Sequence, residues 1–165
     1  MSERAPSGRS GHLPGKRGGH PLAPQLIGTW RLVSREDRTA NGERRIDPGL
    51  GPDPVAILVY DHAGNFAAQF MKRDRSADEV GVAARAGVNN SAAVGGYDAY
   101  FGKYTVDEAA SSVTQTLDGA LSPGDVGKVV TREMHVDGDQ LTIALATTNA
   151  GGEPITRTLT WRRSA

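Results

Sequence analysis

The sequence predicts an all-β protein, an up-and-down antiparallel barrel of about eight strands. Three observations lead to this prediction. Short apolar runs recur along the chain, and several alternate with polar residues at the period of a β-strand. Residues that form turns separate these runs. The chain also has 21 glycines and nine prolines among 165 residues, a high share that favours strands and turns over long helices. Closing such a sheet is the simplest way to remove its exposed edges.

The chain divides into an extension and one domain. A length of 165 residues fits a single domain. Residues 1–24 are rich in Gly, Pro and Ser, carry four basic residues against one acidic residue, and include almost no large apolar side chain. Such a segment buries too little apolar surface to offset the entropy of ordering it. We therefore predict a disordered basic extension over 1–24, with a lid or a weak electrostatic contact as the alternative, and a barrel domain over 25–165.

The first strands of the domain start after Leu26. The first is expected to alternate strictly, with Trp30, Leu32 and Ser34 on one face and Arg31, Val33 and Arg35 on the other. Residues 55–60 and 66–71 form a predicted hairpin, with Gly64 in the left-handed region of its loop. A three-residue loop puts one set of side chains together, namely Leu58, Tyr60, Phe66, Ala68 and Phe70. A four-residue loop would mix the two faces.

Five more strands complete the prediction: Tyr100–Val106, Ser112–Leu117, Val129–Val136, Gln140–Ala146 and Ile155–Arg163. Their connections contain Asp, Asn, Gly and Pro, which are turn residues. The stretch 76–96 is rich in Ala with scattered Gly, and it predicts one or two short helices that close one barrel end or pack outside.

Composition excludes several classes of function. Lys plus Arg and Asp plus Glu are 19 each, so the chain lacks the basic balance of a nucleic-acid binder. Cysteine is absent, which rules out disulfides and thiolate sites. We expect no membrane span and no signal peptide, and hence a cytoplasmic protein. Phosphate-loop, dinucleotide, nucleophile-elbow and zinc motifs are missing, and the four histidines do not cluster, so we expect no cofactor and no metal.

Five segments give the chain a resemblance to the lipocalin-like domain family of bacteria and fungi. They are LIGTWRLVS at 26–34, VYD at 59–61 with Gly64, YDAYFGKYTVDE at 97–108, GDQLT at 138–142 and LTWRR at 159–163. The resemblance covers nearly all of 26–163 and implies a small β-barrel with a central apolar cavity, but no single reaction. Family members often carry His where this chain has Gln115, so a role of that His does not transfer.

The opening Gly-Thr-Trp is also similar to that of true lipocalins. In those proteins the Trp packs at the closed end of the barrel under an Arg from the last strand. The resemblance implies the same contact between Trp30 and Arg162 or Arg163, and an Arg stacked on an indole contributes about 0.5–2 kcal/mol. We expect this pair to be structural.

Alternation also suggests which side chains line the cavity. Few aromatic residues and many small ones predict a roomy interior. If Lys103 faces solvent, its neighbours Gly102 and Tyr104 face inward, and so does Tyr100. Placing the polar residues of the next two strands in solvent likewise directs Gln115, Arg132 and Met134 inward. A buried guanidinium needs an internal carboxylate, a ligand or a wet mouth. The candidate catalytic residues are Tyr100, Tyr104 and Arg132, and the candidate ligand-binding residues are Tyr60, Phe70, Gln115, Met134 and Arg157.

These residues predict a function based on the cavity. Arg132 would bind a carboxylate, enolate or diketone oxygen, a tyrosine would donate a hydrogen bond or proton, and Gln115 would orient the ligand. We expect the barrel to bind a small hydrophobic metabolite, polyketide- or terpenoid-like, and to act on it as a cofactor-free cyclase, isomerase or dehydratase of secondary metabolism. The alternative is a non-catalytic carrier. An outward apolar stripe such as Ile57, Val59 and Met71 would make the chain a homodimer.

Overall fold

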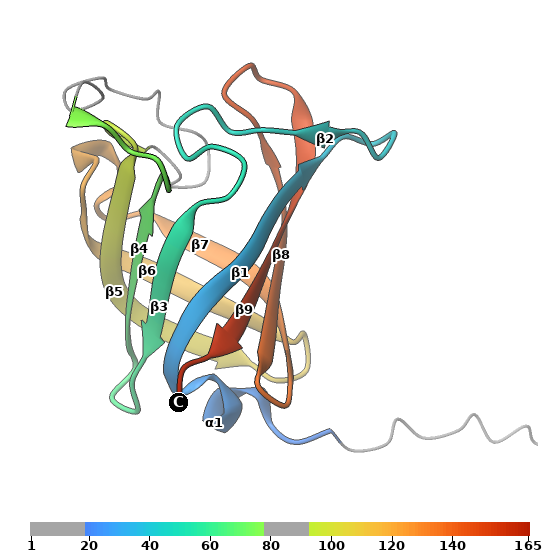
Figure 1. The fold of residues 1–165 in the computed structure, drawn as a ribbon. Helices are drawn as coiled ribbons and strands as arrows, with labels where there is room; N and C mark the ends of the chain where they lie inside the picture. The colour runs from blue at the N-terminus through green and yellow to red at the C-terminus, as the bar shows by residue number, and fades with distance from the viewer. Residues whose placement is uncertain (1–18, 78–92) are drawn as a thin grey trace, which may run out of the picture.

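The described part of the chain consists mostly of strands. A computed structural model describes residues 19–77 and 93–165 (Figure 1). Its elements in chain order are α1 (Leu22–Leu26), β1 (Gly28–Arg38), β2 (Arg44–Arg45), β3 (Val55–Tyr60), β4 (Asn65–Met71), β5 (Tyr97–Asp107), β6 (Ser112–Ala120), η2 (Pro123–Asp125), β7 (Val129–Asp137), β8 (Gln140–Thr148) and β9 (Pro154–Arg163).

These strands form one closed antiparallel sheet. Their order is β2-β1-β3-β4-β5-β6-β7-β8-β9, and β1 also pairs with β9. The second pairing closes β1 and β3–β9 into an eight-stranded barrel, while the two-residue β2 extends from β1 (Figure 1). Closure satisfies the backbone groups that an open sheet would leave at its edges. The predicted all-β, up-and-down barrel of eight strands is confirmed.

The predictions for the two uncertain segments concern residues that are largely outside the described ranges. The helices expected over 76–96 fall mainly on residues 78–92. Residues 1–18 of the predicted extension are likewise outside the described ranges. The last residues of that extension, Leu22–Pro24, belong to α1, and Leu22 is buried in the core. The sequence did not predict helix α1.

The β3–β4 hairpin has the predicted facing. Gly64 has a φ of 85°, in the left-handed region where glycine is favoured. The Asp61 side chain accepts hydrogen bonds from the backbone N–H groups of Ala63 and Asn65, at 2.9 and 2.8 Å. Tyr60 therefore pairs with Phe66, and the predicted inward set is buried: Leu58, Tyr60, Phe66, Ala68 and Phe70.

The strict alternation predicted for the first strand is wrong. The pairing of β1 with β9 shifts between Leu32 and Ser34, so Val33 is an extra residue that bulges outward and is 53% exposed. One inserted residue exchanges the two faces of the strand beyond it. Arg35 and Asp37 are consequently buried. The bulge thus places two charged side chains inside the barrel.

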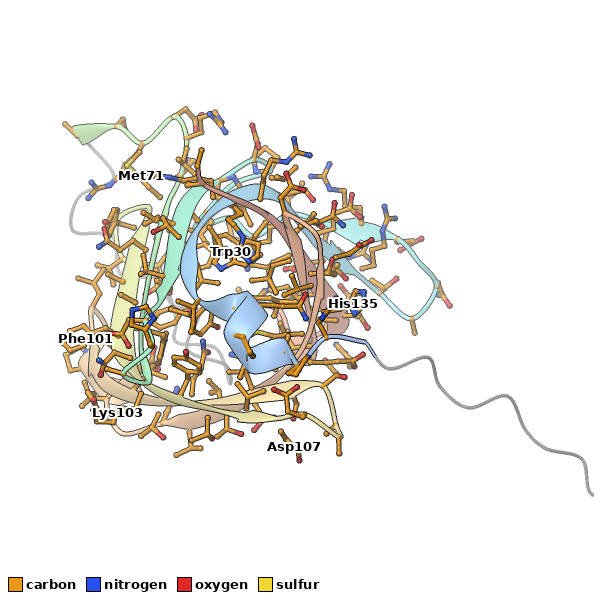
Figure 2. All side chains as sticks on the ribbon, turned by 90° about the horizontal axis from the view of Figure 1, so that it is seen from below. Trp30, Met71, Phe101, Lys103, Asp107 and His135 are labelled. Atoms are coloured by element: carbon orange, nitrogen blue, oxygen red, sulfur yellow. The ribbon has the colours of Figure 1, made fainter. Side chains whose placement is uncertain are left out.

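The closed end lies beside α1, as the view from below shows (Figure 2). Trp30 is buried, and its Nε1–H donates to the Leu26 carbonyl at 2.8 Å. The Arg163 guanidinium lies 4.2 Å from the centre of the Trp30 ring and donates to the Ile27 carbonyl at 2.7 Å. The predicted structural pair is therefore confirmed, with Arg163 as the arginine.

Helix α1 is attached to the barrel by a carboxylate. Glu108, just after β5, accepts hydrogen bonds from the backbone N–H groups of Leu22 and Ala23 at 2.6 and 2.9 Å. These groups begin the helix and have no partner within it. The end opposite α1, here called the mouth, carries the loops that follow β1, β4, β6 and β8 (Figure 1). No helix in the described ranges has the length and apolarity to cross a membrane.

Candidate functional site

The candidate site is a small cavity in the middle of the barrel. Its volume is about 40 Å³. It is lined from seven strands, β3 to β9, by Leu58, Ala68, Phe70, Tyr100, Gln115, Arg132, Met134, Ile143, Leu159 and Trp161. A space of this size accommodates about one to three water molecules. The roomy interior that the composition suggested is therefore wrong for this structure, because aromatic and long aliphatic side chains occupy most of the space.

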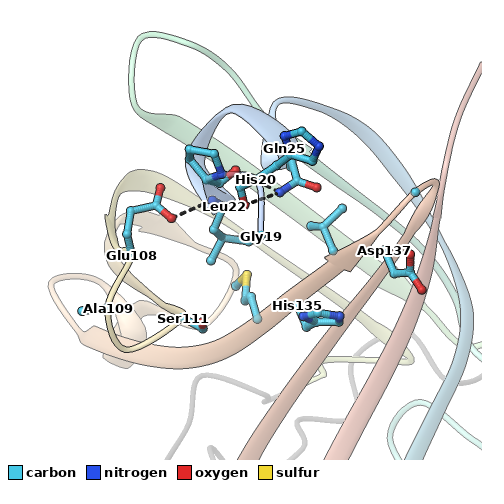
Figure 3. A pocket seen from close by; sticks show the side chains of 13 residues that line it. Gly19, His20, Leu22, Gln25, Glu108, Ala109, Ser111, His135 and Asp137 are labelled. Atoms are coloured by element: carbon cyan, nitrogen blue, oxygen red, sulfur yellow. Dashed lines mark hydrogen bonds between the residues drawn. The ribbon is translucent and has the colours of Figure 1, made fainter. Parts of the chain in front are cut away.

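A second, larger hollow lies outside the barrel, between the residues at the start of α1, the turn that joins β5 to β6, and the end of β7 (Figure 3). This outer groove has a volume of about 1130 Å³ and is open to solvent. Its carboxylate Glu108 already binds the start of α1, and Gln25 donates to the carbonyls of His20 and Pro21. Glu108 and Gln25 thus hold the helix in place, and we regard the inner cavity as the stronger candidate.

Gln115 and Met134 line the inner cavity, and both form hydrogen bonds with Tyr60, which is not part of the lining. The Gln115 Nε2 group donates to the Tyr60 hydroxyl at 2.9 Å, and that hydroxyl donates to the Met134 sulfur at 3.6 Å. All three side chains are buried. Burial raises the pKa of Tyr60 far above its usual range, so its hydroxyl stays protonated. Three of the predicted site residues are thereby brought together from β3, β6 and β7.

Phe70 and Tyr100 form an aromatic part of the lining, on the two strands between β3 and β6. Their rings stack with centroids 6.3 Å apart, and Phe70 also meets Trp161 edge-on at 5.7 Å. Tyr100 is half-buried and points inward, as the outward position of Lys103 on the same strand requires (Figure 2). Both predicted residues therefore contribute to the cavity, with Tyr100 supplying a hydroxyl-bearing ring.

Tyr104 lies nearer the closed end and does not line the cavity. Its hydroxyl donates to the Asp61 carbonyl at 2.7 Å, and its ring meets the Tyr60 ring edge-on at 4.8 Å. Partial burial raises the pKa of Tyr104 above its usual value. The structure thus separates Tyr104 from Tyr100 and Arg132, with which it was grouped as a candidate catalytic residue.

Arg132 is the charged member of the cavity lining. It is only 8% exposed, and its Nη1 group donates to the Thr131 carbonyl at 3.3 Å. Burial is the main cause that lowers the pKa of Arg132, and the positive charge of Arg157 contributes. Gln115 and Arg132 were predicted to lie on adjacent strands, and they do, because β6 pairs with β7. A desolvated cation in an apolar wall interacts strongly with an anionic or carbonyl oxygen.

Arg157, in contrast, lies at the mouth and pairs with an internal carboxylate. Its Nε and Nη2 groups donate to the two carboxylate oxygens of Asp37 at 2.7 and 2.9 Å. Arg35 lies 3.8 Å from the same carboxylate and binds Asp47 at 2.9 Å. The sequence left three alternatives for a buried arginine: an internal carboxylate, a ligand or solvent at the mouth. For Arg157 the structure shows the internal carboxylate.

The sequence reading missed Asp98, a buried acid between the mouth and the cavity. Asp98 pairs with Phe70 across β4 and β5 and is two residues before Tyr100, so it faces the same side. Burial raises the pKa of Asp98 to about 7, with Asp125 and Asp47 adding to the rise and the Ala99 N–H and Arg35 opposing it. The alternation that turned Tyr100 inward also applies to Asp98 and was the available signal.

Trp161 also belongs to the cavity, although it was not among the predicted site residues. It is 1% exposed, lines the cavity, and carries an indole N–H with no hydrogen-bond acceptor among the described residues. Within those same residues, no group of three or more His, Asp or Glu side chains is arranged to hold a metal ion.

Comparison with known proteins identifies a family. No curated protein matches the chain. A family model described as a lipocalin-like domain matches residues 27–164, which span the whole barrel. The predicted resemblance is confirmed, and the chain belongs to the lipocalin-like domain family.

Proposed function

We propose that the barrel binds one small, mostly apolar molecule, with an oxygen-bearing group directed to the polar side chains of the inner cavity. Family membership and the closed barrel support the binding of a small ligand. The observation that carries the proposal is that Gln115 and Arg132, both buried, line the same otherwise apolar and aromatic cavity. A few placed polar groups in an apolar wall are typical of ligand sites.

The ligand makes its space by moving side chains. Ligand pockets usually measure about 300–1,000 Å³, far more than the inner cavity. Met134 lines both the inner cavity and the outer groove, so it lies between them. A methionine side chain has three rotatable bonds and adapts readily to new surroundings. Rotation of Met134 would join the two spaces and admit a ligand beside α1.

The catalytic form of the proposal is a cofactor-free isomerase, cyclase or dehydratase acting on a polyketide- or terpenoid-like substrate. Arg132 would stabilise an enolate oxygen, and Tyr100 would donate a hydrogen bond to it. Asp98, with a pKa of about 7, would remove a proton from the carbon beside the carbonyl and return it to another carbon. An isomerisation of this kind conserves all atoms and electrons. Tyr104 and Arg157 remain predicted site residues. Tyr104 would act through its contact with Tyr60, and Arg157 would act from its position at the mouth.

The alternative is a carrier that binds the same molecule without changing it. Gln115 favours this form, because its hydrogen bond to Tyr60 makes it an orienting group in the wall. Binding by orienting groups and apolar contacts needs no proton transfer. The two forms therefore differ in whether Asp98 exchanges a proton with the ligand.

Native mass spectrometry of the purified full-length chain tests the proposal. We expect a retained small molecule that is lost from the Arg132→Met variant and kept by Arg162→Met, which removes an exposed arginine on the same barrel. The released molecule is then incubated with fresh protein and followed by chromatography and mass. An isomer of unchanged mass or a product lacking one water supports the enzyme, and unchanged material supports the carrier. Equal retention by both variants contradicts the proposed site.

Two further expectations accompany the proposal. Ile57, Val59 and Met71 are half-buried on the outer face of β3 and β4, and a homodimer through this stripe stays a prediction. Sedimentation of the full-length chain measures it. A cytoplasmic location also stays a prediction.

A further inference from the structure

The starting point is the indole of Trp161, which is buried without a hydrogen-bond partner. Its residue is 1% exposed, and no described residue accepts from its Nε1–H group. An indole nitrogen can only donate. A buried donor left without an acceptor costs about 1–3 kcal/mol, so native structures rarely keep one without a reason.

The second tryptophan of the chain gives an internal comparison. Trp30 is equally buried, but its Nε1–H donates to the Leu26 carbonyl at 2.8 Å. The two indoles therefore differ in one respect that a measurement can follow: the closed end supplies an acceptor for Trp30, and the described barrel wall supplies none for Trp161.

The surroundings of Trp161 point to the missing acceptor. In the sheet Trp161 is paired with Leu141 on one side and Leu32 on the other, and its ring meets Phe70 across the barrel. These neighbours have no side-chain acceptor. Trp161 also lines the inner cavity together with Gln115 and Arg132. An acceptor for its N–H is therefore best supplied from within the cavity.

We propose that the Trp161 Nε1–H donates a hydrogen bond to the ligand, and that the ligand is consequently a carbonyl compound (a ketone, ester or lactone) rather than a hydrocarbon. This inference rests on the proposed function and makes its ligand class specific. A carbonyl oxygen has two lone pairs and no proton, so it can accept from the indole and from a second donor of the lining at once. Trp161 is then a binding residue that selects for the carbonyl.

Two probes of the same shape test the inference. Acetophenone and α-methylstyrene are both planar and differ in a carbonyl oxygen against a methylene group. The full-length protein is labelled with ¹⁵N at the two indoles and ¹³C at the isoleucine methyl groups. The Ile143 methyl signal reports an occupied cavity, since Ile143 lines it, and the exposed Ile46 serves as the control.

We expect both probes to shift the Ile143 signal, and acetophenone alone to move the Trp161 indole proton downfield. The Trp30 indole signal should stay in place with either probe. In the Trp161→Phe variant we expect acetophenone to bind about tenfold more weakly, the usual effect of losing one hydrogen bond, with α-methylstyrene unchanged. Trp30→Phe removes an indole outside the cavity and should not change the ratio of the two affinities.

The outcomes separate the inference from the function on which it rests. If both probes shift the Ile143 methyl signal but acetophenone leaves the Trp161 indole proton signal unchanged, the barrel binds ligands and the indole does not donate to them. The same conclusion follows if Trp161→Phe weakens both probes equally. If neither probe shifts Ile143, the proposed function fails and the inference fails with it. The indole measurement on the unmodified protein holds even if Trp161→Phe does not fold.

Discussion

The two ends of the barrel hold an arginine from the same strand in different ways. Arg163 and Arg157 both belong to β9 and both face inward. At the closed end Arg163 stacks on Trp30 and donates to the backbone carbonyl of Ile27, which is neutral. At the mouth Arg157 pairs with the Asp37 carboxylate, beside Arg35 and Asp47. A backbone carbonyl thus binds the arginine of the closed end, whereas carboxylates bind the arginines of the mouth.

This difference shows that packing contacts and buried charges are concentrated at opposite ends of the barrel. The closed end combines a large aromatic side chain with backbone acceptors, an arrangement that stabilises one packing. The mouth holds several buried charges whose balance depends on each partner. The cavity lies between the two, and Arg132 is the charged residue in its lining. The following five predictions test this division, beginning with the largest expected effect.

Truncating the aromatic side chain should damage the closed end most. Trp30→Ala is expected to lower the free energy of unfolding by about 3–5 kcal/mol, as large aromatic truncations in a core do. Chemical denaturation measures it. Trp30→Phe keeps most of the packing and removes the hydrogen bond to Leu26, so its loss should be smaller. A Trp30→Ala protein of normal stability with altered ligand binding would move Trp30 from the structural end into the site.

Breaking the mouth ion pair should cost nearly as much. Asp37→Asn leaves Arg157 and Arg35 buried near an uncharged amide, and removing one partner of a buried pair costs about 3 kcal/mol or more. Thermal and denaturant unfolding measure it. The matched control is Glu36→Gln, the neighbouring residue on β1, because its ion pair with Arg38 is exposed and contributes little. Equal effects of the two changes would show that the mouth is as wet as the outer surface.

The mouth should also be the source of pH dependence. The pKa of Asp98 is raised to about 7 from an ordinary 3.8, so between these values the folded protein holds a proton that the unfolded chain has lost. Asp98 therefore stabilises the fold at low pH, and this contribution declines by about 1 kcal/mol per pH unit as pH rises from 4 to 7. Asp98→Asn should remove that slope, measured by denaturation across the range. An unchanged slope would place the titrating group elsewhere.

Arg132 is the charged residue of the cavity lining, and replacing it should affect ligand binding. Arg132→Met keeps much of the packing and removes the charge, so affinity for acetophenone or the retained molecule should fall by about 1.5–3 kcal/mol, ten- to a hundredfold. Stability should stay the same or rise, since a buried charge is removed. A ligand titration beside a thermal melt distinguishes the cases. If stability falls instead, Arg132 belongs to the ion-pair network, and if neither changes, the proposed site is wrong.

The N-terminal residues should matter least, up to the point where α1 begins. Residues 1–18 include few apolar side chains, so their deletion should leave the melting temperature within a few degrees. Deletion of 1–24 also removes Leu22 and both backbone groups that Glu108 binds, so a larger fall is expected. Differential scanning calorimetry compares the two. A large fall for the shorter deletion, together with weaker ligand binding, would instead support a lid.

Local pattern was enough to predict most of the barrel. The alternation of apolar and polar residues identified the inward positions of β3–β7 and β9, including Gln115 and Arg132, because side chains of a strand alternate regardless of its partners. Gly64 signalled its turn through the backbone conformation that glycine tolerates. The contact between Trp30 and the last strand followed from resemblance to the lipocalins, although the choice between Arg162 and Arg163 was left open.

The remaining features depend on contacts between distant residues. The bulge at Val33 arises from the register of β1 against β9, and it turns Arg35 and Asp37 inward against the local pattern. Asp37 then forms an ion pair with Arg157, 120 residues away. The sequence could indicate that a buried arginine needs a carboxylate, but it could not identify which residue supplies it. The pKa of Asp98, the small cavity and the unpartnered Trp161 indole likewise follow from how the strands close around one space. Sequence alone therefore determined which side chains point inward on the strands that alternate regularly. Only the closed barrel decided where the alternation breaks in β1 and which inward side chains meet, because alternation is a property of one strand and pairing is a property of all eight.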